Sequence, residues 1–139
     1  SGQDKFKDMK VRELLETEAM GLSINKIDQQ QVDALIEKVK ALSGGQQEHE
    51  HWEADDQVHT LFARHCGNPV LAGMIDQART QSRLFELVTP FNRIEEDRQE
   101  HLAILEGWES GDADTARHAV SQHLRNLSAF VLKRLSEGG

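Results

Sequence analysis

Apolar residues recur every three or four positions along most of the chain, the spacing of helices that bury one face. Near the start they stand at Val11, Leu14, Leu15 and Leu22, with Glu18 in the same register. The next run is Val32, Leu35, Ile36, Val39 and Leu42. Similar spacing predicts helices over 48–65, from Pro69 onward, over 94–108 and over 116–135. The pattern therefore predicts six helices and an all-α fold.

Residues that favour helix ends separate these segments. Asp28 is expected to cap the second helix, Gly44-Gly45 to end it, and Pro90 to close the fourth. Gly67-Asn68-Pro69 is typical of a stop, an N-cap and a first helical residue, and Gly111-Asp112 of a turn and cap. Because the connections are short, we expect a six-helix antiparallel bundle.

The composition narrows the classes of function. Sixteen Lys and Arg against 24 Asp and Glu give a net charge of −8, so the chain lacks a surface that could neutralise phosphates. One cysteine, Cys66, cannot form an internal disulfide, and a cytoplasmic protein is expected. No apolar stretch reaches the roughly 18 residues of a membrane span.

The length of 139 residues suits one ordinary domain. Ser1-Gly2 is typical of a remnant of tag removal, which indicates that the natural protein extends further towards the N-terminus. We expect residues 1–3 to be a tail, 4–136 the helical domain, and 137–139 a second tail.

Three of the seven histidines share the register of apolar neighbours. They are His59 with Trp52 and Phe62, His101 with Ile104, Leu105 and Trp108, and His123 with Val120, Leu127 and Phe130. Asp55 lies one turn before His59 on the same stripe. Three helices are therefore expected to send metal-competent groups inward.

Two interpretations of these groups are open. A single inward histidine is usually a neutral core residue bonded to a carbonyl. A buried Asp55 with three inward histidines is better compensated by a divalent cation with nitrogen and oxygen ligands. The pattern favours a site for one ion, for which Zn²⁺, Ni²⁺ and Mn²⁺ are all chemically admissible.

The remaining polar residues give weaker indications. His65 and His118 are out of register with the inward histidines, and we expect both at the surface. Glu48 and His51 match the Glu-x-x-His spacing of di-iron bundles, but no second inward copy accompanies them, and His49 flanks the same loop.

Two arginines flank the apolar stripes of the first and fourth helices. Arg12 and Arg79 are each expected to pair with a carboxylate, such as Glu16, or to reach a bound anion.

The order of several motifs resembles the effector-binding FCD domain of FadR-type GntR transcription regulators. The resemblance rests on Asp55-x-x-x-His59, Cys66-Gly67-Asn68-Pro69-Val70-Leu71, Glu100-His101-x-x-Ile104-Leu105, Gly111-Asp112-x-x-x-Ala116 and His123-Leu124, with Arg12-x-x-Leu15-Glu16 resembling the start of the first helix. It covers nearly the whole chain, and the combined order is more specific than any single motif.

The resemblance implies a six-helix antiparallel bundle that senses small organic acids, often through a metal, and works as a dimer beneath winged helix-turn-helix domains. It implies Asp55, His59, His101 and His123 as metal ligands, the same four that helical register selects. Val58 departs from the aromatic residue usual in the family. No winged helix-turn-helix segment is present in the sequence, so we expect either a part of a longer regulator or a free-standing sensor. Members of this family that bind acyl-CoA lack the metal histidines, so the presence of all four ligand residues argues against a long-chain acyl-CoA effector.

We expect a metal-dependent carboxylate sensor of a bacterial GntR/FadR-type regulator, not an enzyme, with Zn²⁺ as the first choice and Ni²⁺ or Mn²⁺ as alternatives. Arg12 or Arg79 would neutralise the acid, and DNA would be bound only by an N-terminal domain outside this chain. The first and fourth helices are expected to form a homodimer contact.

The alternative is a mononuclear metal-dependent hydrolase, which needs a general base beside the metal. Glu16 is the candidate base.

Overall fold

The computed structural model describes residues 2–42, 48–88 and 93–138. Within them lie six helices and no strands, which confirms the all-α prediction. The helices are α1 (Gly2–Leu22), α2 (Gln29–Ala41), α3 (Glu48–Arg64), α4 (Pro69–Val88), α5 (Ile94–Glu109) and α6 (Ala113–Gly138). The predicted roles of Gly44-Gly45 and Pro90 lie outside the described residues.

The predicted helix caps are confirmed. Asp28 Oδ1 accepts a hydrogen bond from the Gln30 amide, and Asn68 Oδ1 accepts from the amides of Val70 and Leu71. Asp112 Oδ2 accepts from the Thr115 amide, so α6 begins at Ala113, three residues before the predicted 116. The outer helices also continue into the segments expected to be tails, since α1 begins at Gly2 and α6 ends at Gly138.

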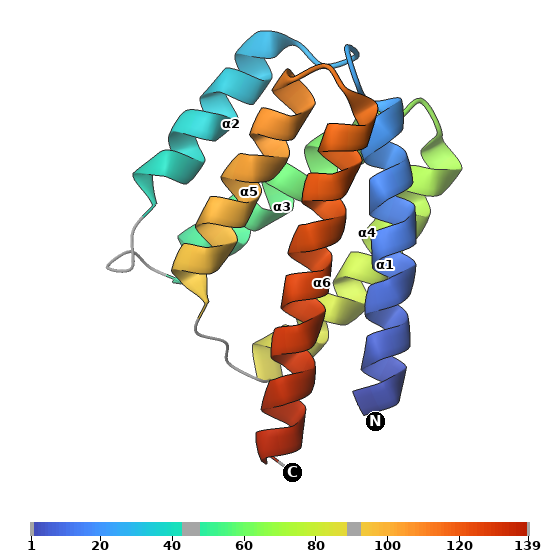
Figure 1. The fold of residues 1–139 in the computed structure, drawn as a ribbon, viewed down its shortest axis with the longest axis vertical. Helices are drawn as coiled ribbons and strands as arrows, with labels where there is room; N and C mark the ends of the chain where they lie inside the picture. Colours follow the sequence, from blue (N-terminus) through green and yellow to red (C-terminus); the bar gives the residue numbers. More distant parts are fainter. Residues whose placement is uncertain (1, 43–47, 89–92, 139) are drawn as a thin grey trace.

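The helices form a bundle in which α3 lies at the centre of the contacts. Figure 1 shows α1, α5 and α6 running side by side, with α3 and α4 crossing behind them and α2 at one edge. α1 packs on α6 and α4, and α5 packs on α6 and α2. α3 contacts α1, α2, α4 and α5, so its inward residues can meet groups from most of the bundle.

The first helix differs from its apolar pattern. Val11 and Leu14 are exposed, whereas Arg12, Glu13 and Glu16 are buried. The apolar stripe read from the sequence therefore does not coincide with the buried face of α1. The reason is that the charged groups of the buried face are paired: Arg12 with Glu16 on the same helix, and Glu13 with Arg125 of α6.

One indole fixes the end of α1 against α5. Trp108 is buried, and its Nε1–H donates to the carbonyl of Ser23 at 3.0 Å. None of the helices in the described ranges is long and apolar enough to cross a membrane.

Candidate metal centre

Four side chains from three helices meet inside the bundle. α3 contributes Asp55 and His59, α5 contributes His101, and α6 contributes His123. One ligand-capable atom of each residue lies within 4.8 Å of those of the others. The centroids of the imidazole rings are 4.7 Å apart for His101 and His123 and 5.4 Å apart for His59 and His101. The structure thus brings together the four residues that helical register selects.

The inward nitrogens of this cluster lack hydrogen-bond partners. In the described part of the chain, Nε2 of His59, His101 and His123 is buried and makes no well-directed hydrogen bond. Asp55 Oδ1 lies 3.0 Å from His101 Nε2 and 3.4 Å from His59 Nε2. Each unpaired buried polar atom costs about 1–3 kcal/mol. A divalent cation held by three imidazole nitrogens and one carboxylate oxygen would satisfy the set, so these residues fit a metal ion.

Two carboxylates hold the outer nitrogens of two of the three histidines. His59 Nδ1 contacts Glu16 of α1, and His123 Nδ1 lies 2.7 Å from Glu100 Oε1. An ionised carboxylate can only accept, so Nδ1–H donates in both pairs and Nε2 is the free nitrogen. This is the arrangement by which outer carboxylates orient histidine ligands in metal sites.

Arginines neutralise the surrounding carboxylates. Arg12 Nε lies 2.7 Å from Glu16 Oε2, which confirms the predicted pairing of these two residues. Arg79 Nη2 lies 3.1 Å from Asp55 Oδ2 and 2.8 Å from Asp56 Oδ1. Arg83 also contacts Asp56. The guanidinium of Arg83 lies over the Trp52 ring, 4.4 Å from its centroid.

The electrostatics favour a cation at Asp55 and His123, whereas His59 must lose a proton before it can bind one, because its pKa is raised. Burial alone would raise the pKa of Asp55, but Arg79 and His59 outweigh it and hold that pKa well below its usual value. Burial lowers the pKa of His123 to about 3, despite its hydrogen bond to Glu100, so this ring is neutral at physiological pH. Burial also lowers the pKa of His59, but Glu16 and Asp55 overcome this effect and raise it.

Comparison with known proteins agrees with this geometry. The family model of the FCD domain matches residues 9–126. The chain belongs to the FCD family. An uncharacterized HTH-type transcriptional regulator, YcbG of Bacillus subtilis (strain 168), is 22% identical over 129 residues. That match covers 93% of this chain and 55% of YcbG, so the chain spans about half the length of this relative.

Two solved structures share the fold. The metal-free FCD domain of TM0439 has a TM-score of 0.82 at 20% identity, with 96% of both chains covered. The Zn²⁺-bound FCD domain of the same protein has a TM-score of 0.80 at 21% identity, with 94% of both chains covered. The six-helix architecture of this chain is therefore the FCD fold.

The other candidates lie outside the centre of this FCD domain. His49 and His118 are exposed, and His65, just after the end of α3, has its Nδ1 2.8 Å from the carbonyl of Leu61 in that helix. His65 is only partly exposed, although it was expected at the surface. The side chain of Glu48 lies outside the described residues, and His51 belongs to neither cluster of metal-competent groups found among those described.

A second cluster joins Asp97 and Glu100 to the outer side of His123. Arg93 pairs with both carboxylates, and its Nη2 lies 2.9 Å from Glu100 Oε2. The guanidinium of Arg93 therefore already supplies the positive charge at this second cluster. The sequence indicated Glu16 as a partner for an arginine and as a candidate base, and Glu100 only as part of a motif, but neither as a partner of a histidine. Their contacts to His59 and His123 join residues 43 and 23 positions apart. Such contacts depend on how the helices pack.

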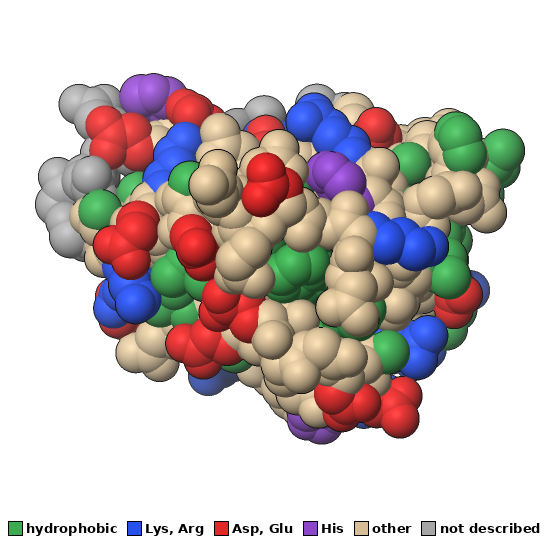
Figure 2. All heavy atoms as spheres, turned by 90° about the horizontal axis from the view of Figure 1, so that it is seen from above, with side chains coloured by type: hydrophobic (Ala, Val, Ile, Leu, Met, Phe, Trp, Pro, Cys, Tyr) green, Lys and Arg blue, Asp and Glu red, His purple; other side chains and the backbone are tan. Residues whose placement is uncertain are grey.

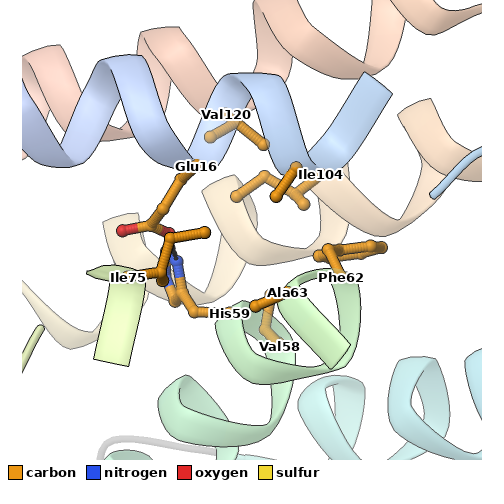
Figure 3. Close-up of a pocket in the computed structure, with 9 residues that line it drawn as sticks. Glu16, Val58, His59, Phe62, Ala63, Ile75, Ile104 and Val120 are labelled. Atoms are coloured by element: carbon orange, nitrogen blue, oxygen red, sulfur yellow. Dashed lines mark hydrogen bonds and ion pairs between the residues drawn. The ribbon is translucent and has the colours of Figure 1, made fainter. Parts of the chain in front are cut away.

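The interior beside the centre is nearly filled. A cavity of about 10 Å³ lies between Glu16, His59 and apolar side chains such as Ile75 and Phe62. Figure 3 shows Glu16 and His59 pointing toward one another at one wall of this cavity. The volume suits about one water molecule.

A metal-content measurement tests the predicted ligands. The wild-type protein is expected to hold one divalent ion per chain, and His101→Ala to lose it because one of four donors is removed. His118→Ala, which changes an exposed histidine outside the centre, serves as the control. Elemental analysis after exhaustive buffer exchange measures both. Equal metal content in wild type and His101→Ala would contradict the assignment.

Proposed function

We propose that this chain is the ligand-sensing domain of a bacterial transcription regulator that binds one divalent metal ion and a small carboxylic acid in the cytoplasm. The observation that carries the proposal is the convergence on Asp55 of three buried Nε2 atoms that make no well-directed hydrogen bond. Membership of the FCD family and the likeness to an HTH-type regulator support the regulatory role. DNA binding would belong to a winged helix-turn-helix domain of the whole protein.

Asp55, His59, His101 and His123 would hold the ion. Zn²⁺ is our first choice because a related FCD domain has been solved with Zn²⁺ bound, and Ni²⁺ or Mn²⁺ also suit nitrogen and oxygen ligands. When bound, the ion supplies a Lewis-acidic position for a carboxylate oxygen. The chain's own residues orient the histidines and balance the charge around them.

Arg79 is the better candidate of the two predicted arginines for binding the acid. The partner of Arg12 is the buried Glu16, which also holds His59. Arg79 instead shares Asp56 with Arg83, and the Asp56 side chain is 49% exposed. A partly exposed carboxylate can swing into water, so an incoming carboxylate could replace Asp56 between the two guanidinium groups. Because the interior cavity holds only about 10 Å³, binding of an acid would also shift the helices.

The rival function is a metal-dependent hydrolase with Glu16 as general base. Burial would raise the pKa of Glu16, but Arg12 and His59 outweigh it and hold that pKa far below its usual value. A carboxylate so strongly held in its ionised form is a poor proton acceptor. This environment favours a sensor over an enzyme.

We also propose that the domain forms a homodimer through α1 and α4. Four large apolar side chains on these adjacent helices are exposed: Val11, Leu14, Val70 and Met74. Figure 2 shows hydrophobic side chains gathered at the right-hand edge of the molecule, the side on which α1 and α4 lie in Figure 1. Exposed apolar patches of this kind mark interaction surfaces, and symmetric dimers are the commonest assembly.

The effector proposal predicts that small carboxylates stabilise the metal-loaded domain. Succinate at 100 times its dissociation constant is expected to stabilise by about 2.7 kcal/mol, or several degrees in melting temperature. Asp56→Asn should bind succinate more tightly because it removes the internal competitor. Glu53→Gln, which removes an exposed carboxylate of the same helix, should not. A thermal-shift titration with and without chelator measures this effect.

Two outcomes would contradict this binding mode. One is stabilisation that survives complete removal of the metal. The other is a compound screen in which neutral or cationic compounds give the largest shifts. Turnover of an acid would favour the hydrolase.

The dimer proposal predicts that Leu14→Glu and Met74→Glu each shift the protein towards monomer, because a charge would be buried at an apolar contact. The wild-type dimer should persist at high salt, since apolar contacts are not screened by ions. Light scattering at micromolar concentration measures both. Glu37→Gln, at an exposed position of α2 outside the proposed contact, is the control. A wild-type monomer, or a dimer unaffected by both substitutions, would refute this interface.

A further inference from the structure

The buried face of α1 carries an ion pair that leads to the candidate metal centre. Glu16 is 5% exposed and contacts His59 Nδ1 on α3. Arg12, one turn earlier and 3% exposed, lies 2.7 Å from Glu16 Oε2. Its Nη1 donates to Ser82 Oγ of α4 at 3.3 Å. A continuous set of polar contacts therefore joins His59 to both α1 and α4.

The fold alone gives little reason for this arrangement. Desolvating a carboxylate and a guanidinium is expensive, and well-packed apolar residues often replace such a pair without loss of stability. Glu16 has a second contact that apolar residues could not supply. It accepts the Nδ1–H of His59, which fixes the ring with Nε2 facing inward and makes that nitrogen a better donor to a metal.

Glu100 makes the same type of contact from a different part of the bundle. It accepts from His123 Nδ1 and is held by Arg93 at 2.9 Å and by Asn126 Nδ2 at 2.9 Å. Glu100 lies on α5 and its partners His123 and Asn126 lie on α6. The two outer carboxylates therefore tie the same centre to different helices, Glu16 to α1 and Glu100 to the α5–α6 pair.

We propose that Glu16 is a positioning residue that couples occupation of the metal site to the docking of α1. The proposal rests on the proposed metal site and adds which helix responds to it. If the Glu16 contact strengthens metal binding by His59, then the bound metal strengthens the docking of α1 by the same free energy, because linkage is reciprocal. α1 also presents Val11 and Leu14 at the surface, so occupation of the centre would reach the proposed dimer contact.

The test compares hydrogen exchange of backbone amides in the full chain with and without saturating Zn²⁺. In the wild type, Zn²⁺ is expected to slow exchange in α1 about tenfold. In Glu16→Gln the α1 effect should shrink while slowing in α5 and α6 remains. Glu100→Gln is the matched control, in which α1 should keep its response. Both variants should lose about 10–100-fold in Zn²⁺ affinity, measured by competition with a chelating dye.

Glu16→Gln leaves the buried Arg12 without its charge partner and could therefore fold poorly. A second, charge-balanced variant keeps the proposal testable in that case. Arg12→Met/Glu16→Met removes both charges and any acceptor for His59, and it should fold and bind Zn²⁺ weakly without protecting α1. Equal protection of α1 in this variant and the wild type would overturn the coupling. Uniform slowing over all helices of the wild type would also overturn it, because that pattern reports global stability alone. Failure of the wild type to bind Zn²⁺ would refute the metal site as well, whereas binding without a response of α1 would refute the coupling only.

Discussion

Three imidazole nitrogens and a carboxylate share the interior of this bundle, and burying them imposes the constraint on which the rest of the structure depends. None of the three Nε2 atoms makes a well-directed hydrogen bond, and a buried polar atom left without one costs about 1–3 kcal/mol. A partner at the centre would offset that cost. A divalent cation does so for the whole set at once, which is why a metal explains the cluster better than three separate core histidines would.

Charge alternates outward from the centre. His59 and His123 are held by Glu16 and Glu100, and these carboxylates are neutralised by Arg12 and Arg93. Asp55 turns one oxygen toward His101 and the other toward Arg79. Because each layer compensates the one inside it, buried charges occur on α1, on α4 and at Arg93, just before α5, without breaking the fold. The same layering connects the centre to elements that reach the surface.

The sequence was sufficient to predict the six-helix fold and the four residues that meet inside it. Asp55 and His59 lie one turn apart on a stripe shared with Phe62, and that periodicity reports which way the side chains face. The helical register predicted the wrong buried face for α1, because Val11 and Leu14 are exposed and Arg12 and Glu16 are buried. An apolar pattern cannot distinguish a helix face that meets the core from one that meets another molecule. Nor could it predict that Glu100 contacts His123, because that pairing depends on the packing of α5 against α6.

The most direct test of the central claim is a two-bond ¹⁵N–¹H correlation spectrum of the histidine side chains, recorded with and without one equivalent of Zn²⁺. Three of the seven histidines, His59, His101 and His123, are predicted to shift at Nε2, with Nδ1 of His59 and His123 protonated throughout. The exposed His49 and His118 should remain unchanged. Shifts confined to the exposed histidines, or a metal bound through Nδ1 of His59 or His123, would contradict the account.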